Sequence, residues 1–292
     1  MNGHTHDGIA ADLEWHRLMK TVRKTGELRR DRTGVGTIAL FGLHASWDLR
    51  EGFPAITTKK LGFAQVRSEL AAFLAGAETL EEFHAHGCNI WDANAKASYW
   101  KPRFEGDVGR IYGVQWKRWR SWSGEPGNLW HRQADQIEAL VDGLRKDPHG
   151  RRHLVTAWNP GELGEMCLPP CHVLFQCFAS DHEGHWLDLQ FHMRSLDLFV
   201  GMPFDIASYG LLLSILARAT DRQPRRLLMT VGDGHLYHNH VEQVDAALAR
   251  EPMRPPQLEL SMDCSGPFDF LNLHARLINY ESHSALPAPM NV

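Results

Sequence analysis

The chain has 292 residues, of which 43% are hydrophobic and 23% charged, and its formal net charge is −4. A chain of this length and composition can bury a large core and is ordinary for a globular protein. The slightly acidic balance argues against general nucleic-acid binding, which usually requires a basic protein. No apolar run reaches the length of a membrane-spanning helix. Any anion site must therefore be a local cluster of arginines.

The cysteines indicate a reducing compartment. Five is an odd number, and their spacing follows no disulfide framework: Cys88, Cys167, Cys171, Cys177 and Cys264. Residues 1–7 lack the basic and apolar regions of a signal peptide. No repeat or linker composition divides the chain. We therefore expect a cytoplasmic protein with one α+β domain over residues 1–292.

Apolar periodicity predicts helices over residues 13–24, 62–75, 131–146 and 206–219. It predicts strands over 37–49, 153–158, 173–178, 227–231, 258–262 and 268–278. Residues 117–130 read as a polar loop, and residues 232–237 lead into a helix that runs to about residue 250. The last seven residues are apolar and stiffened by two prolines, so we expect them to fold over a pocket.

Cys171 is the first candidate for chemistry. It follows Pro169 and Pro170, which stop any helix or central strand, and it opens the predicted strand 173–178. Arg194, Ser195, Asp197 and Asp205 follow on later segments. A thiol with these groups suits nucleophilic attack on an anionic substrate. The alternative is that Cys171 is another buried thiol, the commoner fate of a free cysteine.

Other motifs are ambiguous by residue type alone. Glu69 lies beside the apolar stripe of its helix, so it is either a surface residue, as glutamate usually is, or a buried carboxyl with a raised pKa. Arg32 precedes Gly34 and Gly36 in a loop that suits either a phosphate or a simple basic turn. Arg151 and Arg152 stand before a strand, where arginines are usually solvent-facing. No metal is expected, because the paired histidines are two residues apart and point to different helix faces.

Taken in order, ten motifs resemble those of the thymidylate synthase superfamily. The resemblance covers residues 31–292 and rests on DRTGxGT (31–37), GFP (52–54), TTK (57–59), IWD (90–92), YGxQW (112–116), RR (151–152), PCH (170–172), RSxD (194–197), PFxIASY (203–209) and GDxHLY (232–237). It implies a thymidylate synthase-like α+β fold, in which a large mixed β-sheet forms a dimer interface and helices surround it.

The resemblance also implies a reaction and the residues that catalyse it. Cys171 would add to C6 of a pyrimidine nucleotide, so that C5 attacks the methylene group of 5,10-methylenetetrahydrofolate. Glu69 would organise water and proton transfers around the base. Tyr112 would assist removal of the C5 proton.

Binding residues follow from the same resemblance. Arg32, Arg194 and Ser195 would hold the 5′-phosphate, with Arg151 and Arg152 donated by the second subunit of an obligate homodimer. His235 and Tyr237 would bind the sugar 3′-hydroxyl. The folate site would be formed by Lys59, Trp91, Asn94, Asp197 and the C-terminal Val292. No membrane or nucleic-acid partner is implied.

One departure from the family bears on the substrate. Asp205 stands where synthases that act on uracil have asparagine, whose amide matches both O4 and N3–H of uracil. A carboxylate accepts from N4 of cytosine and favours a proton on N3, whereas it would meet O4 of uracil lone pair to lone pair. Asp205 resembles the residue of phage deoxycytidylate hydroxymethylases, and cytidylate hydroxymethylases of nucleoside-antibiotic pathways belong to the same superfamily. The alternative is a neutral Asn-to-Asp change.

The resulting hypothesis is a C5-hydroxymethylase that converts CMP or dCMP with 5,10-methylenetetrahydrofolate and water. The alternatives are a thymidylate synthase that methylates dUMP and a weakly catalytic relative that acts as a nucleotide- or RNA-binding regulator. The bacterial look of the Ala-, Arg- and Gly-rich composition slightly favours CMP. Met193 and Leu196, where the family usually has glutamine and a smaller residue, predict a re-shaped base pocket.

Overall fold

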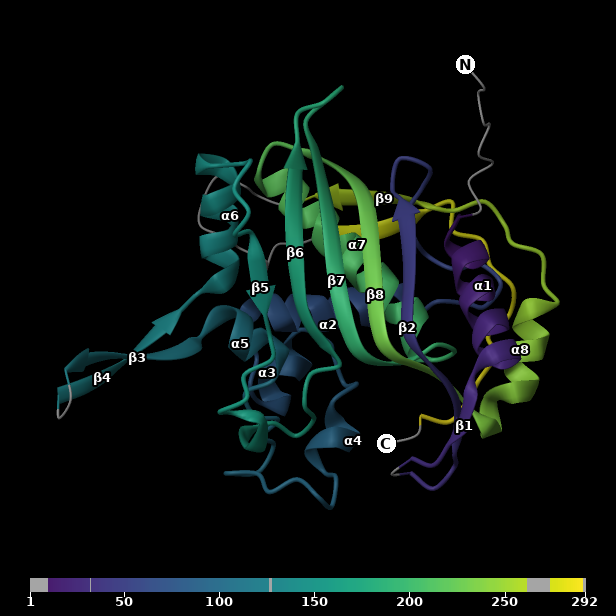
Figure 1. Ribbon diagram of the computed structural model, residues 1–292, viewed down its shortest axis with the longest axis horizontal. Coiled ribbons are helices and arrows are strands. Elements are labelled where there is room, and N and C mark those ends of the chain that lie inside the picture. Colours follow the sequence, from purple (N-terminus) through teal and green to yellow (C-terminus); the bar gives the residue numbers. More distant parts are fainter. Residues whose placement is uncertain (1–9, 32, 126–127, 262–273, 291–292) are drawn as a thin grey trace.

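The computed structural model describes residues 10–31, 33–125, 128–261 and 274–290. Its centre is a six-stranded mixed sheet in the order β1-β2-β8-β7-β6-β5, in which only β7 and β8 are parallel (Figure 1). The strands are β1 (Glu27–Arg29), β2 (Thr37–Asp48), β5 (Leu154–Thr156), β6 (His172–Ser180), β7 (Trp186–Asp197) and β8 (Gln223–Tyr237). This architecture confirms the predicted α+β class.

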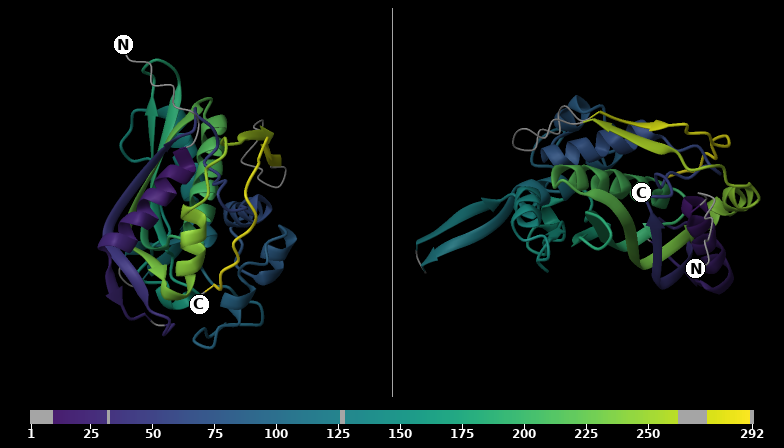
Figure 2. Two further views of the ribbon diagram at one scale, coloured as in Figure 1. Left: turned by 90° about the vertical axis from the view of Figure 1, so that its right-hand side faces the viewer. Right: turned by 90° about the horizontal axis from the view of Figure 1, so that it is seen from above.

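Two long helices cover one face of the sheet. α7 (Gly201–Ala219) packs on β7 and β8, and α2 (Phe63–Ala75) packs on α7 from the outside (Figure 2). α1 (Ala10–Thr25) packs against β2. α7 is apolar nearly all round because it is buried between the sheet and α2. No helix of the described ranges has the length and apolar character needed to cross a bilayer.

The remaining elements lie around this centre. The shorter helices are α3 (Leu80–Ala85), α4 (Asp92–Ala95), α5 (Tyr112–Lys117), α6 (Gln136–Lys146) and α8 (Val241–Leu248), with 3-10 turns η1 (Leu163–Glu165) and η2 (His238–His240). Two antiparallel hairpins pair β3 (Trp119–Glu125) with β4 (Asn128–Ala134), and β9 (Gln257–Ser261) with β10 (His274–Ile278). The β3–β4 hairpin projects from the body (Figure 1).

The predicted loop over residues 117–130 is wrong, and so is the start of the following helix. Residues 119–125 and 128–134 pair as the β3–β4 hairpin, with Trp119 opposite Ala134. α6 begins only at Gln136, because the Asp135 side chain accepts a hydrogen bond from the amide of Glu138 and caps the helix there. The predicted strand over 268–278 is β10 from His274 on, and its earlier residues lie outside the described ranges.

Residues 232–237 are the end of β8, and the helix predicted after them is present as η2 followed by α8. Tyr237 pairs with Thr37 on β2, and His235 pairs with Asp197 on β7. The glycines of this segment serve close packing: a Cβ on Gly232 would lie 2.9 Å from the carbonyl oxygen of Arg194. α7 starts five residues before its predicted position, since a proline is tolerated in the first turn of a helix. Asp205 is therefore a helical residue.

Candidate functional site

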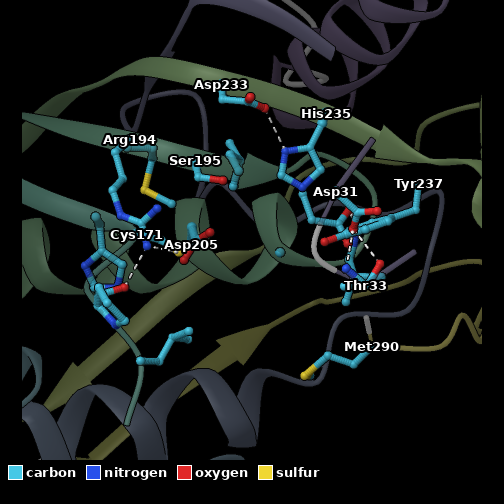
Figure 3. A pocket seen from close by; sticks show the side chains of 18 of the residues that line it. Asp31, Thr33, Cys171, Arg194, Ser195, Asp205, Asp233, His235, Tyr237 and Met290 are labelled. Carbon is cyan, nitrogen blue, oxygen red and sulfur yellow. Dashed lines mark hydrogen bonds and ion pairs between the residues drawn. The ribbon is translucent and has the colours of Figure 1, made fainter. Parts of the chain in front are cut away.

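A cavity of about 620 Å³ lies where β7 ends, α7 begins and the loop before β6 turns (Figure 3). It has the size of a ligand-binding pocket. The structure brings eleven of the residues expected at the site into its lining: Glu69, Trp91, Asn94, Tyr112, Cys171, Arg194, Ser195, Asp197, Asp205, His235 and Tyr237. Met193 and Leu196, the two unusual residues beside the arginine motif, also line it.

Cys171 sits at the proline corner beside a guanidinium. Arg194 donates from Nε to the carbonyl of Pro170 (2.8 Å) and from Nη2 to that of Pro169 (2.9 Å), which fixes the guanidinium against the corner. Arg194 Nη2 lies 3.9 Å from Cys171 Sγ. A cation at this position stabilises negative charge on the sulfur, as a nucleophilic thiolate needs.

The other described cysteines differ from Cys171. Cys88, Cys167 and Cys177 are buried in the core, and burial raises the pKa of the Cys88 thiol to about 11 and that of Cys167 to about 12. Burial also raises the pKa of Cys177. Such thiols are inert, whereas Cys171 is partly exposed to the cavity. Geometry thus favours the nucleophile interpretation of Cys171.

Tyr112 links α5 to the cysteine corner. Its hydroxyl oxygen accepts a 2.8 Å hydrogen bond from the backbone amide of Cys171. Burial and the neighbouring Cys171 raise the pKa of Tyr112 well above its usual value, so the phenol keeps its proton. The ring of His172 stacks on Tyr112, with centroids 4.0 Å apart, and burial lowers the pKa of His172 to about 3. The ring stacked on Tyr112 is therefore a neutral imidazole.

Two acidic side chains face the cavity from different helices. Burial raises the pKa of Glu69 on α2 to about 7, while a 3.0 Å hydrogen bond from Trp91 Nε1 to Glu69 Oε1 opposes that shift. Burial, with Glu69 and Asp197 as negative neighbours, raises the pKa of Asp205 well above its usual value. Glu69 can therefore hold or release a proton near neutral pH, and the Asp205 carboxyl favours its protonated form. The surface position that residue type favours for Glu69 is not the one observed.

At the end of the cavity away from Cys171, the side chains of Asp233 and His235 point toward one another (Figure 3). Arg29 Nη1 donates to Asp233 Oδ2 at 3.0 Å, and His235 Nδ1 lies 3.1 Å from Asp233 Oδ1. The hydrogen bond from His235 keeps the pKa of Asp233 below its usual range. An ionised carboxylate only accepts, so His235 Nδ1 carries hydrogen and Nε2 is left to face a ligand. Tyr237 lies on the same strand two residues on.

The glycine loop before β2 has the conformation that its glycines suggest. Gly34 and Gly36 have φ of 78° and 81°, in the left-handed region that favours glycine. Asp31 organises the loop: its Oδ1 accepts from the amide of Gly36 at 2.9 Å, and Oδ2 accepts from Thr33. Arg32, expected on this loop, lies outside the described residues, as does Val292.

Three other expected site residues do not line the cavity. Lys59 is buried, and its Nζ donates to the carbonyl of Phe199 at 2.7 Å; burial lowers its pKa to about 8. Arg151 and Arg152 are exposed on the segment before β5. Exposed arginines away from the cavity of their own chain are what donation to a second subunit would require.

Sequence reasoning missed Asp233, Arg29 and Met290. Asp233 stands two residues before His235 on a strand, and alternate residues of a strand point to the same face of the sheet. This spacing could have identified Asp233 as a neighbour of His235. Arg29 reaches Asp233 only through the pairing of β1, β2 and β8. Met290 lines the cavity because the C-terminal segment returns to it, as its composition suggested.

The comparison with known families agrees with this geometry. The chain matches the family model described as thymidylate synthase over residues 13–292. Members of that family are one-carbon transferases that bind a nucleotide and a folate and use methylenetetrahydrofolate. The match spans nearly the whole chain and includes every residue that lines the cavity. The chain therefore belongs to the thymidylate synthase family and is an enzyme of the one-carbon transferase type.

Proposed function

We propose that this enzyme is a cytidylate C5-hydroxymethylase that acts as a homodimer of single-domain chains covering residues 1–292. CMP, or dCMP, would receive a hydroxymethyl group on C5 from 5,10-methylenetetrahydrofolate and water, releasing tetrahydrofolate. The observation that carries the proposal is the acid at position 205, on the wall of the cavity that also holds Cys171.

Recognition of cytosine requires one proton between Asp205 and the base. A protonated carboxyl donates to N3 and accepts from the N4 amino group, and the pair is equally matched when the proton moves to N3. The raised pKa of Asp205 supports this role, because burial already favours a proton on this carboxyl. After addition at C6, electron density builds up at N3, and Asp205 would be placed to neutralise it.

A proton on Asp205 would also allow uracil to bind. A neutral carboxyl can donate to O4 and accept from N3–H, so a protonated Asp205 does not exclude uracil outright. N3 of cytosine is a basic ring nitrogen, whereas O4 of uracil is only weakly basic. The cytosine complex therefore retains the proton more strongly than the uracil complex. This observation is the reason to keep thymidylate synthase activity on dUMP as the second candidate.

The remaining catalytic steps fall to three side chains. Cys171, as thiolate, would form a bond to C6, aided by the guanidinium of Arg194 near its sulfur. Tyr112 accepts from the Cys171 amide, so its own hydroxyl proton remains to orient a water or a base near C5. Glu69, with a pKa of about 7, is suited to take up and return protons around the ring.

Phosphate and sugar contacts would occupy opposite ends of the nucleotide. Arg194 and Ser195 would hold the 5′-phosphate together with Arg32, and Arg151 and Arg152 of a second subunit would complete the cluster. Several guanidiniums suit a phosphate dianion, because each makes charge-assisted hydrogen bonds. His235 and Tyr237 would bind the sugar hydroxyl, with Asp233 holding the imidazole in one tautomer.

The folate would lie against Trp91, Asn94 and Asp197. The residues present fit such a group: an indole offers a flat apolar surface, and an amide and a carboxylate supply hydrogen-bond partners at the same wall. The bound folate would supply the one-carbon unit. Lys59 would support this wall from behind, since its ammonium donates to the carbonyl of Phe199 and lies near Asp197. Val292 would close over the folate site.

The sheet supports the homodimer. α2 and α7 cover only one of its faces (Figure 2). Large apolar side chains are exposed on its strands, among them Phe41 on β2 (81% exposed) and Phe178 on β6 (62% exposed). A sheet face that no helix covers and that exposes such side chains is suited to a protein interface. A second copy of the chain would cover them and bring Arg151 and Arg152 to the neighbouring cavity.

Two assays on the purified enzyme test the proposal. Tritium release from C5-labelled CMP, dCMP and dUMP identifies the base and the sugar. Absorbance at the dihydrofolate band identifies the product, because hydroxymethylation leaves tetrahydrofolate and methylation leaves dihydrofolate. We expect tritium release from a cytidylate without dihydrofolate formation. Release from dUMP alone, with stoichiometric dihydrofolate, would establish the thymidylate synthase alternative.

A further inference from the structure

The C-terminal segment runs back to the cavity along a fixed path. After β10, residues 279–290 pass the loop between β2 and α2 and reach the cavity at Met290 (Figures 2 and 3). Tyr280 donates to the carbonyl of Ile56 at 2.8 Å, and the amide of His283 donates to the carbonyl of Thr57 at 2.8 Å. These contacts secure the first half of the segment, several residues before the cavity.

His240 makes the contact nearest the cavity. It closes η2 directly after β8, and its side chain is fully buried. Its Nε2 lies 2.9 Å from the carbonyl oxygen of Pro289. A carbonyl only accepts, so Nε2 donates. The ring packs on Phe199, with centroids 5.8 Å apart, and on Tyr237, with centroids 5.5 Å apart, which leaves it no freedom to swing away.

The other nitrogen of the same ring faces a cavity residue. His240 Nδ1 lies 3.8 Å from Asp197 Oδ2. The second oxygen of that carboxylate accepts from the amides of Phe199 (2.9 Å) and Val200 (3.0 Å), so Asp197 is itself fixed at the start of α7. One buried imidazole thus lies between the wall of the cavity and the segment that reaches its mouth.

We propose that His240 is a positioning residue that holds the end of the C-terminal segment over the cavity through the Pro289 carbonyl. The hydrogen bond is partly buried, because His240 is fully buried whereas Pro289 is exposed. Its loss leaves the Pro289 carbonyl to water, so the end of the segment is released at the modest net cost of one hydrogen bond. The ring of Pro289 fixes its φ angle, so a hydrogen bond that holds its carbonyl also sets the direction of the chain toward Met290. His240 itself need not touch a substrate.

A matched pair of substitutions separates this role from simple core packing. In His240→Gln the side-chain amide reaches about as far as Nε2 and can still donate to Pro289. In His240→Asn it is one methylene shorter and cannot. His283→Asn is the control on the segment itself: His283 also donates from Nε2 to a backbone carbonyl, that of Glu251 at 2.9 Å, but it stands six residues before Pro289.

The experiment measures how fast a carboxypeptidase releases residues up to Met290 from the full-length, folded, ligand-free enzyme. We expect roughly tenfold faster release in His240→Asn, and release within about twofold of the original chain in His240→Gln and His283→Asn. The KM for the folate should rise in His240→Asn by a similar factor, with little change in the affinity for nucleotide alone. The second readout depends on the proposed function, whereas the first does not.

Three results would overturn the proposal. Unchanged release in His240→Asn would show that the contact does not hold the segment. Equal acceleration in His240→Gln and His240→Asn, or in His283→Asn, would show that the donor at this position is not what matters. A His240→Asn chain that no longer folds, beside a folded His240→Gln chain, would show that the contact supports the fold as a whole and not the position of the C-terminal segment alone.

Discussion

Tyr112 and Cys171 are joined by a hydrogen bond in which the tyrosine hydroxyl accepts from the backbone amide of the cysteine at 2.8 Å. The phenol therefore fixes the nucleophile's backbone and keeps its own proton for the cavity, since its pKa lies well above the usual value.

Removal of that hydroxyl should slow chemistry more than binding. We expect Tyr112→Phe to lower kcat by roughly 10²-fold or more, the usual range for a lost acid–base or proton-orienting group, with nucleotide affinity nearly retained. Steady-state kinetics and nucleotide titration measure the two quantities. A KM effect with unchanged kcat would show that Tyr112 only shapes the pocket.

Glu69 should give the folded protein a pH-dependent stability. Its pKa is raised from 4.5 to about 7 in the folded state, so the folded chain binds more protons than the unfolded chain between these values. The free energy of unfolding must then fall as pH rises from about 4.5 to 7. Glu69→Gln, which mimics the protonated form, should be the more stable chain above pH 7 by up to about 3 kcal/mol.

Denaturant titrations of both chains at pH 5 and pH 8 check this sign. The stability difference between Glu69→Gln and the original chain should be small at pH 5 and large at pH 8. A difference that does not change with pH would mean that Glu69 is ionised in the folded protein at both values, and proton transfer by Glu69 would lose its basis.

Base selectivity should itself depend on pH. Asp205 has a raised pKa, and the cytosine complex shares the required proton between two basic sites while the uracil complex does not. We therefore expect kcat for the cytidylate to be retained to a higher pH than kcat for dUMP, because kcat reports the protonation of the enzyme–substrate complex. Measurements of kcat with each nucleotide at saturation across a pH series compare the two profiles. A cytidylate kcat that falls at a lower pH than the dUMP kcat would contradict the shared-proton account.

Shared active sites can be tested by mixing inactive chains. Cys171→Ser lacks the nucleophile, and the double variant Arg151→Gln, Arg152→Gln lacks the arginines proposed to cross the interface. In a mixed dimer one cavity has an intact Cys171 and receives intact arginines from the other chain. Random mixing in equal amounts should restore about a quarter of full activity, because half of the dimers are mixed and each has one complete site. No recovery would place these arginines outside the neighbouring site.

The sequence predicted the elements whose burial imposes a periodic spacing of apolar residues. α2 and α7 carry the apolar periodicity of buried helices, and β6 begins after two prolines that stop the preceding chain. The β3–β4 hairpin was missed because its residues are polar and aromatic without an apolar period. Its sequence does contain Pro126-Gly127, a dipeptide that marks a turn and would have indicated a break between two elements.

The sequence predicted which residues line the cavity but not which of them are protonated. Motif order identifies the residues that gather in the cavity, because several motifs lie at the ends of elements that meet there: RSxD ends β7, GDxHLY ends β8 and PCH opens β6. The raised pKa values of Glu69 and Asp205 could not be read from residue type, since they depend on burial and on one another's presence. Nor could the place of Lys59, which turns from the cavity to the Phe199 carbonyl.

The central claim is that Asp205 selects an amino-pyrimidine. The most direct test compares kcat/KM for CMP, dCMP and dUMP in the original enzyme and in Asp205→Asn. The account predicts a preference for a cytidylate in the original enzyme and a shift toward dUMP of about 10²-fold or more in the variant, because an amide cannot release a proton to N3. An original enzyme that prefers dUMP, or a variant with unchanged preference, would contradict it.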